Sequence, residues 1–354
     1  MKVSRIENDS TVCMNRRDKY NPILDIVKFV MSILIVIIHT SFLHEKLYPW
    51  LRVAVPLFFM ISSYLFFSKL SGSITVQDER KTLMKFTKRN LQLYAFWFVV
   101  LFPLTLKIRG WYLGNIFVTF FKIIRSFFLG STFVASWFIM AMVIAIWLIY
   151  YLSKVINSKI LLWATFFIYV FASCLYSSYV KVFPDNIIVS TFYSACKYLH
   201  IEPSLSFPVA LFWVFCGKCF ADGNIRINMK YSIIILMVSS LFLYLEWDFI
   251  KEITGSHSND CYIFLAPMCI GLMSIIIQMK FNKECNLIIL RKMSTIIYAL
   301  HGSIVPVSSA ALRYFNVYTY GLSLIFVLCI CFACCFFIFK FERIKLFSFL
   351  KYAY

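Results

Sequence analysis

The chain has 354 residues, of which 61% are hydrophobic and only 14% are charged, and its formal net charge is +19. A soluble globular protein is about half apolar and about a quarter charged, so this composition excludes a water-soluble domain and predicts an integral membrane protein. The positive charge is spread over short segments, which argues against a nucleic-acid-binding protein and favours basic loops that orient a membrane protein.

Runs of nearly twenty apolar residues predict an all-α protein with about ten transmembrane helices. About twenty helical residues cross the hydrocarbon core of a bilayer, and in lipid every backbone amide must be paired within its own segment. We expect one domain, with a segment 1–22, a helix bundle 23–340 and a tail 341–354. The predicted spans are 23–43, 50–69, 91–108, 136–153, 159–178, 207–222, 231–249, 259–279, 292–312 and 318–340.

The basic residues predict the orientation of the bundle. If the N-terminus is cytoplasmic, the segments on the cytoplasmic side hold 24 Lys and Arg, and the segments on the outer side hold 10. Cytoplasmic loops of membrane proteins carry an excess of basic residues. Both termini are therefore predicted to be cytoplasmic.

Two segments between the spans have their own character. Residues 113–129 combine regularly spaced Phe and Ile with Lys122 and Arg125, which predicts an amphipathic helix at the outer interface. Residues 76–90, VQDERKTLMKFTKRN, are predicted to be a basic cytoplasmic connection.

The first span carries Asp25, Lys28 and His39. Lys28 and His39 are separated by about 20° around a helix and by about 16 Å along its axis, so they share one face. Ionisable residues inside a span usually face the bundle interior, and histidine exchanges a proton near neutral pH, which makes His39 a candidate base. The alternative is that these residues lie at the lipid headgroups, with Lys28 reaching the surface.

Other polar residues within the spans are further candidates. Pro56 interrupts the second span and predicts a kink or break there, followed by Ser62 and Ser63, which could line a cavity. A proline that only adjusts packing is the alternative. Glu246 near the outer end of the seventh span and His301 in the ninth are the other candidates, although His301 could also be a histidine satisfied within the bundle.

The twelve cysteines lie mostly inside apolar runs. Two Cys-x-x-Cys pairs occur, Cys216/Cys219 and Cys331/Cys334, and neither has a nearby histidine. We expect them to be small packing residues, and we predict no metal site.

Several of these motifs together resemble the bacterial membrane acyltransferase type 3 family. The first span, LDIVKFVMSILIVIIHTSF, has Asp25 and His39 where the family has them, although Lys28 replaces the family's arginine. The stretch VPLFFMISSYLFF matches the family's next motif, with Ser63 in place of the usual glycine. Weaker matches are KFTKRNLQLY, the pair Trp137–Phe138 in SWFIMAMV, and Tyr298-x-x-His301. The chain is similar to members that consist of the membrane domain alone.

The resemblance implies transfer of an acetyl group from cytoplasmic acetyl-CoA to a hydroxyl of a cell-surface polysaccharide, or of its lipid-linked precursor, of the O-antigen or capsule type. It implies an enzyme of a bacterial cell membrane, the inner membrane in a Gram-negative cell. No tightly bound cofactor and no nucleic acid are expected. The acyl group, the sugar and the oligomeric state are left open.

The resemblance also suggests roles for individual residues. His39 would deprotonate the acceptor hydroxyl or relay the acyl group, with His301 or Glu246 as its partner. Lys28 would hold the donor or pair with Asp25. Hydrogen bonds to the oxyanion would come from Ser62 and Ser63. Phosphate would be bound by Lys85, Lys88 and Arg89.

Two other functions fit part of the pattern. A transporter also has many helices, proline-broken spans and buried titratable groups, although no inverted repeat is visible here. A non-catalytic membrane scaffold would tolerate replacement of His39 and His301. The basic residues around Arg89 also fit a positive-inside anchor without any phosphate binding.

Overall fold

The computed structural model describes residues 21–110, 115–255, 261–279 and 286–354, and these ranges form helices joined by short turns. The predicted all-α class is confirmed. The elements are α1 (Pro22–Thr40), η1 (Glu45–Leu47), α2 (Tyr48–Leu51), α3 (Ala54–Leu70), α4 (Val76–Arg109), α5 (Ile116–Leu129), α6 (Ser136–Val155), α7 (Ser158–Ile168), η3 (Tyr169–Leu175), α8 (Ile187–Tyr198), η4 (Pro203–Leu205), α9 (Phe207–Ala221), α10 (Met229–Thr254), α11 (Leu265–Gln278), α12 (Ile288–Tyr314), α13 (Tyr320–Phe341) and η5 (Lys345–Ala353).

Within the described residues, eight helical stretches are long and apolar enough to cross a membrane, and each coincides with a predicted span. The predicted spans 207–222 and 259–279 correspond to the shorter helices α9 and α11; residues 259–260 lie outside the described ranges. Helix α9 has 15 residues, of which ten are buried, because it packs against α3, α6 and α7. The protein is a multi-pass membrane protein; the number of spans and the side of its termini stay predictions.

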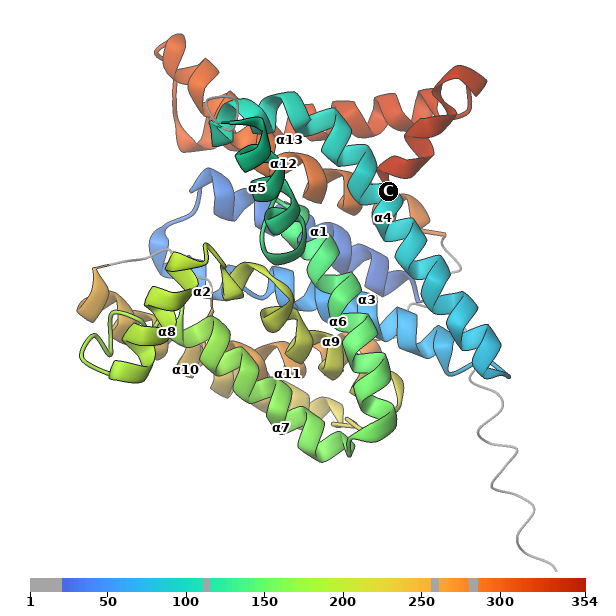
Figure 1. Cartoon of the computed structure of the whole chain (residues 1–354), viewed down its shortest axis with the longest axis vertical. Helices are drawn as coiled ribbons and strands as arrows, with labels where there is room; N and C mark the ends of the chain where they lie inside the picture. Colours follow the sequence, from blue (N-terminus) through green and yellow to red (C-terminus); the bar gives the residue numbers. More distant parts are fainter. Residues whose placement is uncertain (1–20, 111–114, 256–260, 280–285) are drawn as a thin grey trace, which may run out of the picture.

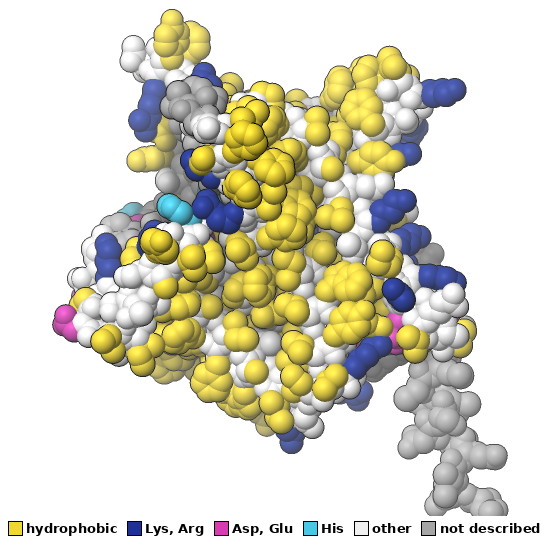
Figure 2. All heavy atoms as spheres, in the orientation of Figure 1, with side chains coloured by type: hydrophobic (Ala, Val, Ile, Leu, Met, Phe, Trp, Pro, Cys, Tyr) yellow, Lys and Arg dark blue, Asp and Glu magenta, His cyan; other side chains and the backbone are white. Residues whose placement is uncertain are grey.

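The surface agrees with this assignment. Figure 2 shows hydrophobic side chains over most of the visible face, with Lys and Arg side chains along its right-hand edge and a second basic group, together with histidine, toward the left. A broad apolar area between two polar margins is the surface expected of a protein that spans a bilayer.

The predicted interruption of the second span is present, and it lies before Pro56. The chain forms α2, turns at Arg52 and Val53, and restarts as α3 at Ala54. Pro56 thus falls in the first turn of α3, where a backbone N–H has no partner within the helix.

The segment 76–90, predicted to be a basic cytoplasmic connection, is helical. Helix α4 runs without a break from Val76 to Arg109 and joins this segment to the predicted span 91–108. The side chain of Thr75 caps it by accepting a hydrogen bond from the backbone N–H of Asp78, and most residues of 76–90 are good helix formers. The amphipathic helix predicted over 113–129 is present as α5, although 113–114 are outside the described residues.

The predicted tail is folded against the bundle (Figure 1). Element η5 packs on α4 and α13, and the indole N–H of Trp97 donates to the carbonyl of Ala353 over 3.0 Å. The predicted segment 1–22 lies almost wholly outside the described residues.

Glycine at position 217 allows α3 and α9 to touch. A Cβ atom at Gly217 would lie 1.9 Å from the Ser63 Oγ atom and 2.5 Å from the backbone oxygen of Met60. The serine that stands at 63 is therefore accommodated by a glycine on the facing helix.

We expect Gly217→Ala to lower the stability of the folded protein by about 1–3 kcal/mol, the usual cost of overpacking a core. Adding Ser63→Gly should recover only part of this, because the contact with the Met60 carbonyl remains. Thermal midpoints of the purified variants would check both statements. Equal midpoints for Gly217→Ala and the unchanged protein would show that the two helices are not in this close contact.

Candidate functional site

Helices α1 and α12 lie side by side and parallel, and they bring together residues far apart in the chain. At one end Asp25 of α1 contacts Arg291 of α12. At the other end His39 of α1 contacts His301 of α12, with ring centroids 4.9 Å apart. Contacts at both ends fix the register of the two helices, and each carries a cation ten or eleven residues before its histidine.

The Asp25–Arg291 pair is a two-point ion pair inside the bundle. The side chain of Asp25 is fully buried, and the guanidinium of Arg291 donates from Nε to Oδ1 over 2.5 Å and from Nη2 to Oδ2 over 3.2 Å. The fork of the guanidinium matches a carboxylate, which makes Arg291 a better close partner for a buried aspartate than a lysine.

Lys28 points to α3. Its ammonium donates to the hydroxyl of Ser62 over 3.0 Å and lies 5.9 Å from the ring centre of Phe58. The close partner of Asp25 is thus Arg291, although Lys28 remains within electrostatic range of both Asp25 and Arg291.

A third cation reaches this group from α4. Arg89 lies within electrostatic range of both Lys28 and Arg291. Arg89 is exposed, as are Lys85 and Lys88 of the same predicted basic group on this helix. The four charged side chains Asp25, Lys28, Arg89 and Arg291, called here the cation cluster, carry a net positive charge.

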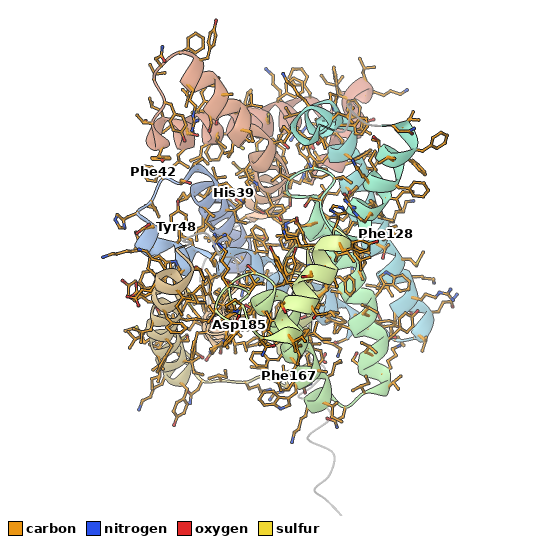
Figure 3. All side chains as sticks on the ribbon, turned by 60° about the vertical axis from the view of Figure 1, so that its left-hand side comes forward. His39, Phe42, Tyr48, Phe128, Phe167 and Asp185 are labelled. Carbon is orange, nitrogen blue, oxygen red and sulfur yellow. The ribbon has the colours of Figure 1, made fainter. Side chains whose placement is uncertain are left out.

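The histidine pair is asymmetric. His301 is 2% exposed, and its Nδ1 atom lies 2.7 Å from the carbonyl oxygen of Tyr298. A carbonyl only accepts, so Nδ1 carries the proton, and Nε2 is the acceptor of the neutral ring. His39 is exposed at the last turn of α1, where Figure 3 shows it next to the loop that carries Phe42.

An aromatic cluster joins the histidine pair to the cation cluster. The Tyr298 ring centre lies 5.6 Å from that of His301, 5.6 Å from Phe58 and 5.1 Å from Phe138. Phe59 lies 4.3 Å from Phe138. The three motifs that the sequence analysis singled out separately, VPLFF, Trp137–Phe138 and Tyr298-x-x-His301, therefore meet in one place.

A second glycine, Gly302, allows a close approach between α12 and the loop before α6. A Cβ atom at Gly302 would lie 2.5 Å from the Val134 Cγ1 atom, so the residue after His301 must be small for the loop before α6 to approach α12.

Two predicted site residues lie elsewhere. Ser63 is buried against α9, and its hydroxyl donates to the Met60 carbonyl of its own helix. Glu246 accepts hydrogen bonds from the Tyr179 hydroxyl over 2.6 Å and from the backbone N–H groups of Ile263 and Phe264 over 2.6 and 2.9 Å. These N–H groups precede α11, so Glu246 caps the start of that helix.

We expect Glu246→Gln to destabilise the protein by about 1–3 kcal/mol, because it replaces charge-assisted hydrogen bonds by neutral ones in a buried place. Acyl transfer per folded molecule should stay near the unchanged level. Thermal midpoints and specific activity, measured on the same preparation, separate the two effects. A large loss of specific activity at an unchanged midpoint would show that Glu246 takes part in catalysis.

Arg291 is the site residue that the sequence reasoning missed. It lies before the predicted ninth span 292–312 and belongs to none of the motifs. A signal did exist: Arg291 stands ten residues before His301, which echoes Lys28 and His39 in the first span.

A bundle of membrane-length helices that carries a histidine pair and a cation cluster defines a multi-pass membrane protein with a polar site. The chain belongs to the membrane acyltransferase type 3 family, because the family model described as an acyltransferase domain matches residues 21–340. It is therefore a membrane acyltransferase. Neither a curated protein nor a solved structure gives a significant match.

Proposed function

We propose that this acyltransferase moves an acetyl group from acetyl-CoA to a hydroxyl of a cell-surface polysaccharide or of its lipid-linked precursor. The observation that carries the proposal is the pairing of α1 and α12, which places two histidines at one end of a shared helix interface and the cation cluster at the other. The interface thus offers a base for a hydroxyl and positive charge for a phosphate-bearing donor.

The donor end is assigned to the cation cluster. Coenzyme A carries several phosphate charges, and Lys28, Arg89 and Arg291 outnumber the single carboxylate of Asp25. Arg and Lys are the side chains that bind phosphate most strongly. The exposed Lys85 and Lys88, within about one turn of Arg89 on α4, would add to the attraction for an anion.

The chemistry is assigned to the histidine pair. His39 accepts the proton of the acceptor hydroxyl while the hydroxyl oxygen attacks the thioester carbonyl. The tetrahedral intermediate then collapses, the ester forms, and the thiolate of coenzyme A leaves and takes up the proton. Two imidazolium rings at 4.9 Å would repel each other, so the pair holds one added proton, which suits a single proton transfer.

Ser62 is placed to support the donor. Its hydroxyl accepts from Lys28 and is free to donate its own proton to an acyl or phosphate oxygen. Ser63 faces away from this interface, so of the two predicted serines we assign a role only to Ser62.

The experiment is transfer of label from acetyl-CoA radiolabelled in its acetyl group into membrane glycan. Membranes from cells that express the protein are compared with membranes from cells that do not. We expect base-labile label in the glycan only in the first, as an O-acetyl ester requires. Movement of an intact solute into sealed vesicles with no ester formed would overturn the proposal in favour of a transporter.

A further inference from the structure

A groove lies at the surface of the bundle between α4 and η5, and its volume is about 350 Å³. The two elements meet beside it, where the ring centres of Phe96 and Phe349 lie 6.3 Å apart and Trp97 donates to the Ala353 carbonyl. With the exception of one glutamine, the side chains that line the groove are apolar or aromatic. The lining includes Gln92, Ala95, Phe96 and Val99 of α4 with Phe349 and Tyr352 of η5.

The position of the groove indicates what fills it. Its α4 residues belong to the predicted span 91–108, so a bilayer surrounds it. Water does not fill an apolar cavity, which leaves a hydrocarbon chain as the occupant. From Gln92 to Val99 the groove follows α4 for about 10 Å, and the hydrocarbon of one leaflet is about 15 Å thick. The groove therefore has the length for one acyl chain of one leaflet.

Basic residues precede the groove on the same face of α4. At 100° per residue, the side chains of four cations fall within about 60° of Gln92 around the helix, and so do the other lining residues of α4. The four cations are Lys81, Lys85, Lys88 and Arg89. Lys88 and Lys85 precede Gln92 by about 6 and 10 Å along the axis. Figure 2 shows Lys and Arg side chains along the edge of the molecule that α4 forms in Figure 1.

Two of these cations are available to an anion outside the bundle. Lys85 and Lys88 are exposed, and neither forms an ion pair with a carboxylate of the part of the chain that the structure describes. Lys81, in contrast, lies 3.8 Å from Asp78, and Arg89 belongs to the cation cluster. Element η5 adds the exposed Lys351, whose ammonium lies 5.2 Å from the ring centre of Tyr352.

We propose that this groove binds an anionic phospholipid, with one acyl chain between α4 and η5 and the phosphate headgroup at Lys85, Lys88 and Lys351. The lipid belongs to the leaflet on the side of these lysines, which the predicted orientation makes cytoplasmic. Basic residues next to a span attract anionic lipids, and the groove holds the chain beside them. Acetyl-CoA also carries phosphate, but it has no long hydrocarbon chain for the groove. Occupancy of this site is independent of the acyl acceptor.

The test uses the full-length protein in phosphatidylcholine vesicles. The vesicles contain a small fraction of phosphatidylglycerol with a photoactivatable group in its acyl chain, and cross-linked peptides are identified by mass spectrometry after irradiation. We expect cross-links on the α4 peptide with Ala95 and Val99 and on the η5 peptide with Phe349. They should be about tenfold more abundant than with phosphatidylcholine that carries the same chain, because several lysines lie near the headgroup.

Matched variants separate the headgroup from the chain. Lys85→Gln with Lys88→Gln should remove most of the preference for phosphatidylglycerol, whereas Lys159→Gln with Lys230→Gln, at exposed lysines of α7 and α10, should not change it.

The chain is tested by filling the groove. Ala95→Trp should remove the groove cross-links of both lipids, because the indole occupies the space of the acyl chain. Val238→Trp, at an exposed position of α10, is its control and should leave them unchanged.

Three results would overturn the proposal. The first is equal cross-linking of the two headgroups at the groove. The second is an even spread of cross-links over α4, α10 and α13, as unselective lipid contact gives. The third is loss of the phosphatidylglycerol cross-links in excess acetyl-CoA, which would assign the lysines to the acyl donor. The cross-links of the unchanged protein decide the matter even where a variant fails to fold.

Discussion

Replacing His39 or His301 by alanine is expected to lower the rate of acyl transfer by about 10²–10⁴-fold, the usual contribution of a positioned general base. The reason is that the two rings form one unit: His301 is held by the Tyr298 carbonyl, and its ring lies 4.9 Å from that of His39. Initial rates with labelled acetyl-CoA, normalised to folded protein, measure the effect.

The double variant shows whether His39 and His301 act together or independently. If the rings act together, His39→Ala with His301→Ala should lose about as much as the more severe single variant, because residues that act as a unit are not additive. His200→Asn is the matched control: His200 lies after α8 with a φ of 50°, a conformation that asparagine tolerates. Losses that multiply would show separate roles, and full activity of His39→Ala would remove it from the mechanism.

Much of this fold could be predicted because lipid imposes a simple constraint on sequence. An apolar run of the required length has few structures open to it, so most of the long helices lie close to the predicted spans, whereas α4 begins well before the span 91–108. The secondary structure of the segments between the spans is harder to predict. Residues 76–90 are predicted to be a connection because they are charged, and their helix propensity and the Thr75 cap continue the helix of the following span through them.

The site was predictable only in part. Residue spacing shows which side chains share a face of one helix, but it does not show which two helices pack together. Lys28 and His39 could be placed on one face of α1, but nothing in the first span shows that α12 faces them. His301 is a candidate because it is an ionisable residue within a span, whereas Arg291 precedes its span, belongs to no motif and has its partner 266 positions away. Glu246 is a candidate because it is an acidic residue near the outer end of a span, and that position does not distinguish a base from a helix cap.

Breaking the Asp25–Arg291 pair is expected to have the largest effect on stability. Asp25→Leu leaves a guanidinium without its carboxylate, and Arg291→Met leaves a fully buried carboxylate without its guanidinium. Removal of one partner from a buried pair costs about 3–5 kcal/mol, whereas replacing both by apolar residues of similar size is often close to neutral. Each single variant should therefore unfold at a lower temperature than the double variant.

The double variant also distinguishes the two roles that Arg291 could have. If Arg291 only anchors α12 to α1, the folded double variant should transfer acetyl groups with an unchanged KM for acetyl-CoA. If it also holds the donor, as proposed here, KM should rise about tenfold or more, since a charged hydrogen bond contributes about 1.5–3 kcal/mol. Lys181→Gln, at an exposed position in the turn after η3, serves as the control and should change neither quantity. A double variant that is stable and has the original KM would restrict Arg291 to a structural role and leave the donor to Lys28 and Arg89.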